Sequence, residues 1–173
     1  MSPSQATYVI RRADVADAGA IAAVHVRSWQ SSYPGVLPKS FLDGLSVKKQ
    51  VERWKHRIIE FEGITFVGAT AEGDVVGFCD AGPNREEESR FPGEIYAIYL
   101  LDEAKRRGLG RALFVAAQEW LRQNEMAAFE VWVLASNAPA RSFYERLGGR
   151  RVAETQLSIA GQTHAEIAYA WSG

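Results

Sequence analysis

The stretch from Glu94 to Gln123 constrains the fold of this chain more than any other part of the sequence. It begins with a nearly continuous apolar run, Glu94 to Leu101, which is typical of a strand covered on both faces. A basic loop follows, and a helical pattern of apolar residues then runs from Gly108 to Gln123. The inward positions of that helix are Leu109, Leu113, Ala116, Trp120 and Leu121. A buried strand joined to an amphipathic helix predicts a sheet with helices packed on it.

Shorter patterns predict the remaining elements. Runs rich in β-formers predict strands at 8–10, 64–70, 75–79, 129–134, 151–158 and 164–171. Apolar spacing predicts a helix from the cap Asp14 to about Trp29, one after the cap Ser46, and one over 138–147. We therefore predict a single domain, residues 1–173, of the α/β class in its α+β form. Its twisted sheet should be mixed and mostly antiparallel, with about seven strands flanked by about four helices.

Composition excludes several classes of function. Twenty Lys and Arg against twenty-one Asp and Glu give a net charge of −1, so no overall basic field attracts nucleic acid or anionic membrane. The single cysteine, Cys79, cannot build a disulfide framework and fits a reducing compartment. Residues 1–7 lack the pattern of an export signal, and no apolar run is long enough to span a bilayer. We expect a cytoplasmic protein without a metal, since the three histidines lack metal-site spacing.

The basic loop has the features of an anion site. Gly108 and Gly110 let a ligand approach the backbone, and the first turn of the helix offers unpaired N–H groups and a partial positive charge. Four cations surround this turn: Lys105, Arg106, Arg107 and Arg111. The alternative is a solvated basic loop, but cations at a helix N-terminus oppose the helix dipole. We therefore favour a phosphate-binding role for the loop.

Known phosphate motifs narrow the ligand. A dinucleotide fingerprint needs a third glycine at position 113, which is Leu, and no phosphate loop ending in Gly-Lys-Ser/Thr is present. The run 105–110, Lys-Arg-Arg-Gly-Leu-Gly, instead resembles the Arg/Gln-x-x-Gly-x-Gly/Ala signature of the GCN5-related N-acetyltransferases (GNAT family). A second family element, Asn-x-x-Ala-x-x-Phe-Tyr-x-x-x-Gly-Phe, resembles residues 137–149, and the order of elements is similar over nearly the whole chain. The departures are Asp102 for the usual Pro, Lys105 for Arg or Gln, Arg106 for Gly, and Gly149 for Phe.

The resemblance implies a GNAT-like acyl-CoA N-acyltransferase fold with acetyl-CoA between the fourth and fifth strands. Its pyrophosphate would lie on the N–H groups of residues 105–111, and its pantetheine arm would pair with Ile98 and Leu100 like an added strand. The N–H of Leu100 would then be the oxyanion donor. Because parted strands expose unpaired backbone groups, an amide-bearing ligand can satisfy them.

Asn137 and Tyr144 have structural explanations beside functional ones. Asn137 precedes the helix start Ala138-Pro139, so an N-cap explains it, and a cofactor contact would be an additional role. Tyr144 points about 100° away from the apolar stripe of its helix, toward the fifth strand. In the resembling family the matching tyrosine protonates the departing CoA thiolate; the alternative is a core tyrosine.

Glu94 is the expected general base. Strand alternation places it on one face with Tyr96, Ile98 and Leu100, and a carboxylate entering a buried strand favours a functional role. An amine with a pKa near 10.4 must lose a proton before it attacks a thioester. Glu94 could take that proton or only bind the acceptor, and the structural alternative is a solvent-exposed strand end.

Trp29 and Tyr33 lie where the first helix enters a Pro-rich loop, the region that shapes the acceptor pocket in the resembling family. Trp29 could equally belong to the core. Tyr33 precedes Pro34 and Gly35, so we expect it to be exposed and to line the acceptor site.

Together these features predict an acetyl-CoA-dependent N-acetyltransferase in which an amine attacks the thioester directly. Glu94 would act as base, Leu100 N–H as oxyanion donor and Tyr144 as acid. The alternatives are a non-catalytic acyl-CoA-binding sensor and a binder of another phosphate ligand. The partner would be a small-molecule or peptide amine, with no nucleic acid and no membrane. Exposed strand edges near the C-terminus also make a homodimer plausible.

Overall fold

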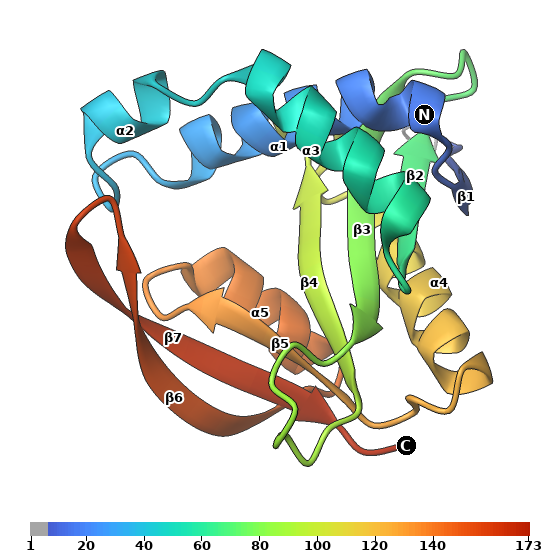
Figure 1. Cartoon of the computed structure of the whole chain (residues 1–173), viewed down its shortest axis with the longest axis vertical. Coiled ribbons are helices and arrows are strands. Elements are labelled where there is room, and N and C mark those ends of the chain that lie inside the picture. The colour runs from blue at the N-terminus through green and yellow to red at the C-terminus, as the bar shows by residue number, and fades with distance from the viewer. Residues whose placement is uncertain (1–6) are drawn as a thin grey trace, which may run out of the picture.

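Seven strands form the centre of the structure, a computed structural model that describes residues 7–173 (Figure 1). They are β1 (Val9–Arg12), β2 (Ile64–Ala69), β3 (Val75–Pro83), β4 (Gly93–Leu100), β5 (Phe129–Leu134), β6 (Arg150–Ile159) and β7 (Gln162–Trp171). They lie in one sheet in the order β1-β2-β3-β4-β5-β7-β6. Neighbours are antiparallel except β4 and β5, which are parallel. The predicted mixed, mostly antiparallel sheet is confirmed.

Helices cover both faces of this sheet (Figure 1). They are α1 (Ala18–Ser32), α2 (Lys39–Asp43), α3 (Val47–Glu60), α4 (Leu109–Gln123) and α5 (Ala138–Arg146), with short 3-10 turns at Val15–Asp17 and Asp102–Ala104. A Cβ on Gly77 would lie against Leu109 of α4, whereas the next residue, Phe78, packs against Trp54 of α3. Since neighbouring strand residues face opposite sides, α3 and α4 lie on opposite faces.

Capping residues set the helix starts as predicted. The side chain of Ser46 accepts from the N–H of Lys49 at 3.4 Å, and that of Asn137 accepts from Ala140 at 3.2 Å. Asp14 caps a 3-10 turn that precedes α1. The helices differ from prediction in two ways: α1 continues to Ser32, and α2 was not predicted because five residues show no helical period.

A β-bulge in the β3–β4 pair corrects the predicted face of Glu94. Asp80 lies opposite Ala97 and Ala81 lies opposite Ile95, so Tyr96 between them has no partner. One extra residue reverses the alternation of side chains. Glu94 therefore does not share a face with Ile98 and Leu100, contrary to the expectation from uninterrupted alternation.

The structure does not describe residues 1–6. The expectation that no export signal is present rested on residues 1–7 and so lies almost wholly outside the described part of the chain. Within residues 7–173, the structure has no helix long and apolar enough to cross a bilayer.

Candidate active site

β4 and β5 separate soon after they meet. Their pairing runs from Gly93 with Phe129 to Ile95 with Val131 and includes no later residue of β4. Beyond that point β4 keeps its ladder with β3 but has no strand on its other side. The backbone groups on that side lack a strand partner. This gap lies between the fourth and fifth strands, where the resemblance implied a ligand.

The backbone of Leu100 faces the gap. The N–H of the next residue, Leu101, points toward β3, where it donates to the carbonyl of Val76 at 2.9 Å. Because backbone groups alternate along a strand, the N–H groups of Leu100 and Ile98 point away from β3. The carbonyl of Leu100 accepts a hydrogen bond from the buried Ser28 hydroxyl of α1 at 3.1 Å. Sequence reasoning did not find this contact.

The basic loop forms a concave set of N–H groups. Arg106 has a φ of 57° and Gly108 a φ of 86°, both left-handed. Left-handed residues beside right-handed ones aim successive N–H groups at one point, which suits an anion. No oxygen within the described chain accepts a hydrogen bond from the N–H groups of residues 106–111. Space beside Gly108 is open, so its backbone conformation, not crowding, favours glycine there.

The four cations of the loop have different environments. Lys105 is bound to Asp102 at 2.6 Å, and this contact lowers the pKa of that carboxyl. Arg106, Arg107 and Arg111 are exposed and form no ion pair with the carboxylates of residues 7–173. These three guanidinium groups therefore remain available for an anion, while the Lys105 ammonium is already held.

Gly110 lies where α4 approaches α5. A Cβ there would be 3.3 Å from the Phe143 ring and 3.8 Å from Leu100. The first of these distances is tighter than ordinary contact. Glycine therefore lets the start of α4 pack close to both the end of β4 and the helix that carries Tyr144.

Tyr144 is a buried residue of α5, 5% exposed. Its ring packs against Tyr169 and Trp171, with centroids 6.3 Å and 6.1 Å away. Burial raises the pKa of the phenol, and the nearby thiol of Cys79 adds to that rise. The neutral phenol is therefore the stable form and can act only as a proton donor near neutral pH.

Asn137 connects two predicted site residues. Its Oδ1 caps α5, which confirms the structural role, and its Nδ2 donates to the hydroxyl of Tyr33 at 3.3 Å. The pairing places the loop after α1 against the start of α5.

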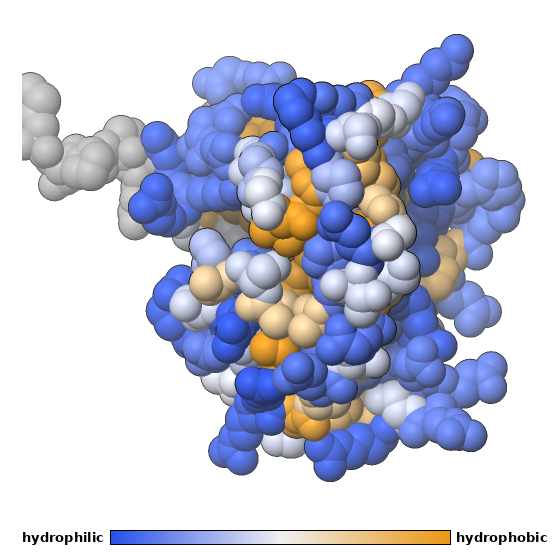
Figure 2. All heavy atoms as spheres, turned by 90° about the vertical axis from the view of Figure 1, so that its left-hand side faces the viewer, coloured by the Kyte–Doolittle hydropathy of each residue, from blue (hydrophilic) through white to orange (hydrophobic). Residues whose placement is uncertain are grey.

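Tyr33 is buried, 6% exposed, so the expectation that it would be exposed is wrong. The loop folds over its ring, which packs on Trp29 at 5.1 Å and belongs to a second apolar cluster with Leu37, Leu42 and Leu134. Burial raises the pKa of its hydroxyl. Trp29 is half-buried, and its buried indole N–H has no hydrogen-bond partner within residues 7–173. Figure 2, which views the side of α2 and the β6–β7 hairpin, shows apolar atoms reaching the surface between polar groups.

Glu94 is 2% exposed, so its solvent-exposed alternative is excluded. Its carboxylate accepts from the Arg85 backbone N–H and from Arg85 Nε, each at 3.1 Å, and forms an ion pair with Arg85 Nη2. Arg85 belongs to the β3–β4 loop and was not singled out by the sequence. Asp80, on the neighbouring strand, is bound by Arg57 at 2.8 Å and by Thr65 at 2.9 Å.

Three further carboxylates share the face of Glu94, one of them Asp80, which lies two residues from Gly82, the partner of Glu94 on β3. Glu130 lies opposite Glu94 in the β4–β5 register, and Glu166 lies opposite Leu134 in the β5–β7 register. Directly paired residues point to the same face, and so do every second residues along β5. The signal for Glu166 was visible in the sequence: it interrupts an apolar strand out of phase with Ile167, which packs in the core.

An aromatic layer connects α1 to β4. His25 stacks on Tyr99 with ring centroids 5.5 Å apart, and its Nδ1 accepts from Trp54 at 3.4 Å. Burial lowers the pKa of His25 to about 4, and Arg53 adds to the effect. The imidazole is therefore neutral at physiological pH and belongs to the packing of this layer.

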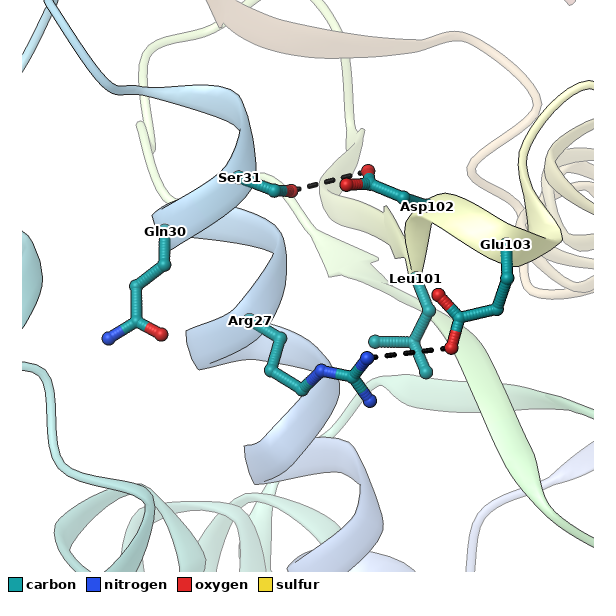
Figure 3. A pocket seen from close by; sticks show the side chains of 6 residues that line it. All are labelled: Arg27, Gln30, Ser31, Leu101, Asp102 and Glu103. Atoms are coloured by element: carbon teal, nitrogen blue, oxygen red, sulfur yellow. Dashed lines mark hydrogen bonds and ion pairs between the residues drawn. The ribbon is translucent and has the colours of Figure 1, made fainter.

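A surface cavity of about 310 Å³ lies between α1 and the turn after β4 (Figure 3). Arg27 reaches Glu103 at 3.5 Å across it, and Ser31 donates to Asp102 at 3.3 Å. The side chain of Gln30 points away from these pairs and binds the carbonyl of Leu42 at 3.0 Å. The charged side chains that line this cavity pair with neighbouring residues, and none of the predicted site residues lines the cavity.

Comparisons with known proteins agree with this geometry. Residues 25–149 match the family model described as the acetyltransferase (GNAT) family. The uncharacterised N-acetyltransferase YuaI of Bacillus subtilis is 39% identical over 162 residues, which cover 94% of this chain and 91% of that protein. The PaiA N-acetyltransferase of Thermoplasma acidophilum, solved with coenzyme A, has a TM-score of 0.73 at 15% identity and covers 95% of this chain and 99% of its own. YncA of Salmonella typhimurium, solved with acetyl-CoA, has a TM-score of 0.70 at 17% identity and covers 95% and 92%.

Proposed function

Because this chain belongs to the GNAT family of acetyltransferases, we propose that it transfers the acetyl group of acetyl-CoA to a primary amine by direct attack. One observation carries the proposal: a concave set of free N–H groups at 106–111 continues into the open side of β4. A pyrophosphate fits the first part, and an amide-bearing arm fits the second. The solved relatives PaiA and YncA hold CoA and acetyl-CoA, which supports this choice of ligand.

The cofactor would be bound mainly by backbone. The N–H groups of Ile98 and Leu100 would receive the pantetheine arm, and those around Gly108 and Gly110 the pyrophosphate. Arg106, Arg107 and Arg111 would add charge at the rim, and Lys105 would act through its backbone. Asn137 would hold the start of α5 beside the arm.

The reacting groups would lie where the gap is deepest. The Leu100 N–H would donate to the oxyanion that forms when the amine attacks the carbonyl carbon. Tyr144 would give its proton to the departing thiolate, a modest contribution because a thiol pKa near 8.5 already makes a fair leaving group. Burial raises the pKa of Cys79, so this thiol is a poor nucleophile and an acetyl-cysteine intermediate is disfavoured.

The acceptor, a small molecule or peptide with a primary amine, would enter from the face of Glu94. Trp29 and Tyr33, whose rings pack together at 5.1 Å, would form one wall. Glu94 would act on the acceptor side of the site by holding the side chain of Arg85 in place. For Glu94 to act as base it would first have to leave the guanidinium that holds it.

Two linked measurements test this function. Thermal unfolding with acetyl-CoA, CoA, NAD and ATP, each near 1 mM, should show stabilisation by the CoA species alone; a ligand at 100 times its Kd adds about 2.7 kcal/mol. Thiol release across a panel of amines should then follow. Stabilisation without release on any amine would favour the sensor, and no stabilisation by CoA would contradict the cofactor site.

A further inference from the structure

Four carboxylates share the acceptor face, and three of them accept hydrogen bonds from neighbouring residues; Asp80 accepts from Arg57 and Thr65. Glu94 is held by Arg85 through backbone and guanidinium. Glu130 accepts from Asn84 at 2.8 Å, from Ser89 at 3.3 Å and from Trp132 at 3.4 Å. At least one oxygen of each of these carboxylates is therefore already occupied by a donor of the protein.

Glu166 is the exception. Its half-buried carboxylate forms no hydrogen bond or ion pair with any side chain of the described chain. Burial raises its pKa, Arg85 opposes that rise, and Glu94 adds to it. Glu166 lies opposite Leu134 in the β5–β7 register, and Leu134 belongs to the apolar cluster of Tyr33 and Trp29, so Glu166 lies beside the wall of the proposed acceptor pocket.

We infer that Glu166, not Glu94, binds the ammonium group of the acceptor and takes its proton. Its position in β7 is fixed by pairing with Leu134 on one side and Thr155 on the other, so the backbone under it is rigid. Among the carboxylates of this face, Glu166 alone has no side-chain donor within residues 7–173 on either oxygen. This assignment rests on the proposed acetyl transfer.

The proton balance follows from this position. The ammonium gives one proton to Glu166, and the neutral nitrogen forms a bond with the carbonyl carbon of the thioester. The carbon–sulfur bond then breaks, and the thiolate takes a proton from Tyr144, which is replenished by the second proton of the attacking nitrogen. Glu166 returns its proton to solvent, so the products are the amide, the free thiol and one proton.

The same charges select the kind of amine. Four carboxylates share this face, and two of them are paired with guanidinium groups, Glu94 with Arg85 and Asp80 with Arg57. A cation is attracted by this surplus, and an acceptor with a carboxylate beside its amine is repelled. The acceptor is therefore an alkyl amine or a diamine, and α-amino acids are poor substrates.

The test is Glu166→Gln, which keeps the shape and removes the proton acceptor. We expect kcat/KM for a diamine such as 1,4-diaminobutane to fall about 100-fold, while stabilisation by acetyl-CoA is unchanged. The wild-type kcat/KM should fall at acid pH as Glu166 takes a proton and level off above that pKa, whereas in the variant the plateau should be lost and kcat/KM should rise with pH toward the pKa of the amine. Glu166→Asp should keep the acid limb and the plateau with reduced activity, which guards against a folding defect in the first variant.

Two control variants show whether the effect belongs to Glu166 itself or to any nearby charged or titratable group. Glu154→Gln removes a carboxylate from β6 opposite Ile167, on the other face of the sheet, and should leave kcat/KM within twofold. His164→Gln removes the titratable group two residues from Glu166 on the same face and should keep the acid limb. The titratable groups that face Glu166 are Arg85, Glu94, Glu130, Tyr33, Tyr99 and His164.

The outcomes distinguish the two proposals. If the wild type releases thiol but Glu166→Gln has the same activity and pH profile, or if α-amino acids are preferred, the assignment of Glu166 is overturned and acetyl transfer stands. If the wild type releases no thiol with any amine, acetyl transfer is overturned and the assignment falls with it.

Discussion

The proposed cofactor site and the proposed acceptor site are built from different material. The cofactor side consists of backbone N–H groups from one continuous stretch, residues 98–111, shaped by two glycines. The acceptor side consists of side chains from α1, the β3–β4 loop, β4, β5 and β7, such as Trp29, Arg85, Glu94 and Glu166. A backbone site depends on conformation, whereas a side-chain site depends on the register of several strands. The first should tolerate changes in side-chain identity, and the second should not.

The largest expected effect comes from crowding the backbone site. Gly110→Leu forces a side chain between α4 and Phe143, so acetyl-CoA affinity should fall at least about 1000-fold, or about 4 kcal/mol. The measurement is the shift in melting temperature with added acetyl-CoA. Gly19→Leu is the matched control, because Gly19 is also the second residue of a helix but has open space around it. Equal cofactor affinity in the two variants would contradict the backbone site.

The fold should lose stability in acid through His25, in the aromatic layer beside the proposed acceptor site. His25 is neutral in the fold with a pKa of about 4, whereas the unfolded chain titrates near 6.5. Below pH 6.5 the unfolded form takes a proton that the folded form does not, so stability falls as pH decreases toward 4, by about 3 kcal/mol in total. Urea unfolding from pH 7 to pH 4 measures this loss. In His25→Gln the decrease should be smaller, and identical curves would show that His25 contributes nothing.

A smaller effect is expected at the boundary between the two sites. Tyr144→Phe removes a proton donor and keeps the ring, so kcat should fall about 10-fold while affinity for acetyl-CoA changes little. Steady-state kinetics and ligand-induced stabilisation measure the two quantities separately. Tyr169→Phe is the control, because this tyrosine packs against Tyr144 but its hydroxyl binds Glu145. Equal losses of kcat and affinity in Tyr144→Phe would make it a packing residue.

The smallest effect should come from the exposed cations. Arg107→Ala removes an unpaired guanidinium from the rim of the loop, and acetyl-CoA affinity should fall about threefold in low salt and less in high salt. Lys105→Ala should have less effect still, since its ammonium is bound to Asp102. Isothermal titration at two salt concentrations compares them, and a larger loss in Lys105→Ala would reverse the distinction.

The same contrast explains how much the sequence could predict. Loop 105–110 and the cap Asn137 are local features, so one stretch of residues determines their conformation. The face of Glu94 was predicted wrongly because the bulge at Tyr96 is set by pairing with β3, which no local pattern records. Tyr33 was expected at the surface, but packing on Trp29 and Leu134 buries it.

Element boundaries show the same limit. The strand predicted over 75–79 continues to Pro83, through Gly82 and Asp80, because β2 and β4 pair with it on both sides. Pairing of this kind overrides weak local propensity. The helix after Ser46 was predicted well, because its cap directly precedes the first residue of its apolar stripe, Val47.

The short pairing between β4 and β5 has a mechanical consequence. Three residue pairs form the backbone ladder between the half-sheet β1-β2-β3-β4 and the half-sheet β5-β7-β6, and the shared apolar core holds the rest of this boundary. A ligand that hydrogen-bonds in the gap bridges this boundary as a missing strand would. Occupancy therefore couples the two halves, and the molecule should unfold more cooperatively when the gap is filled than when it is empty.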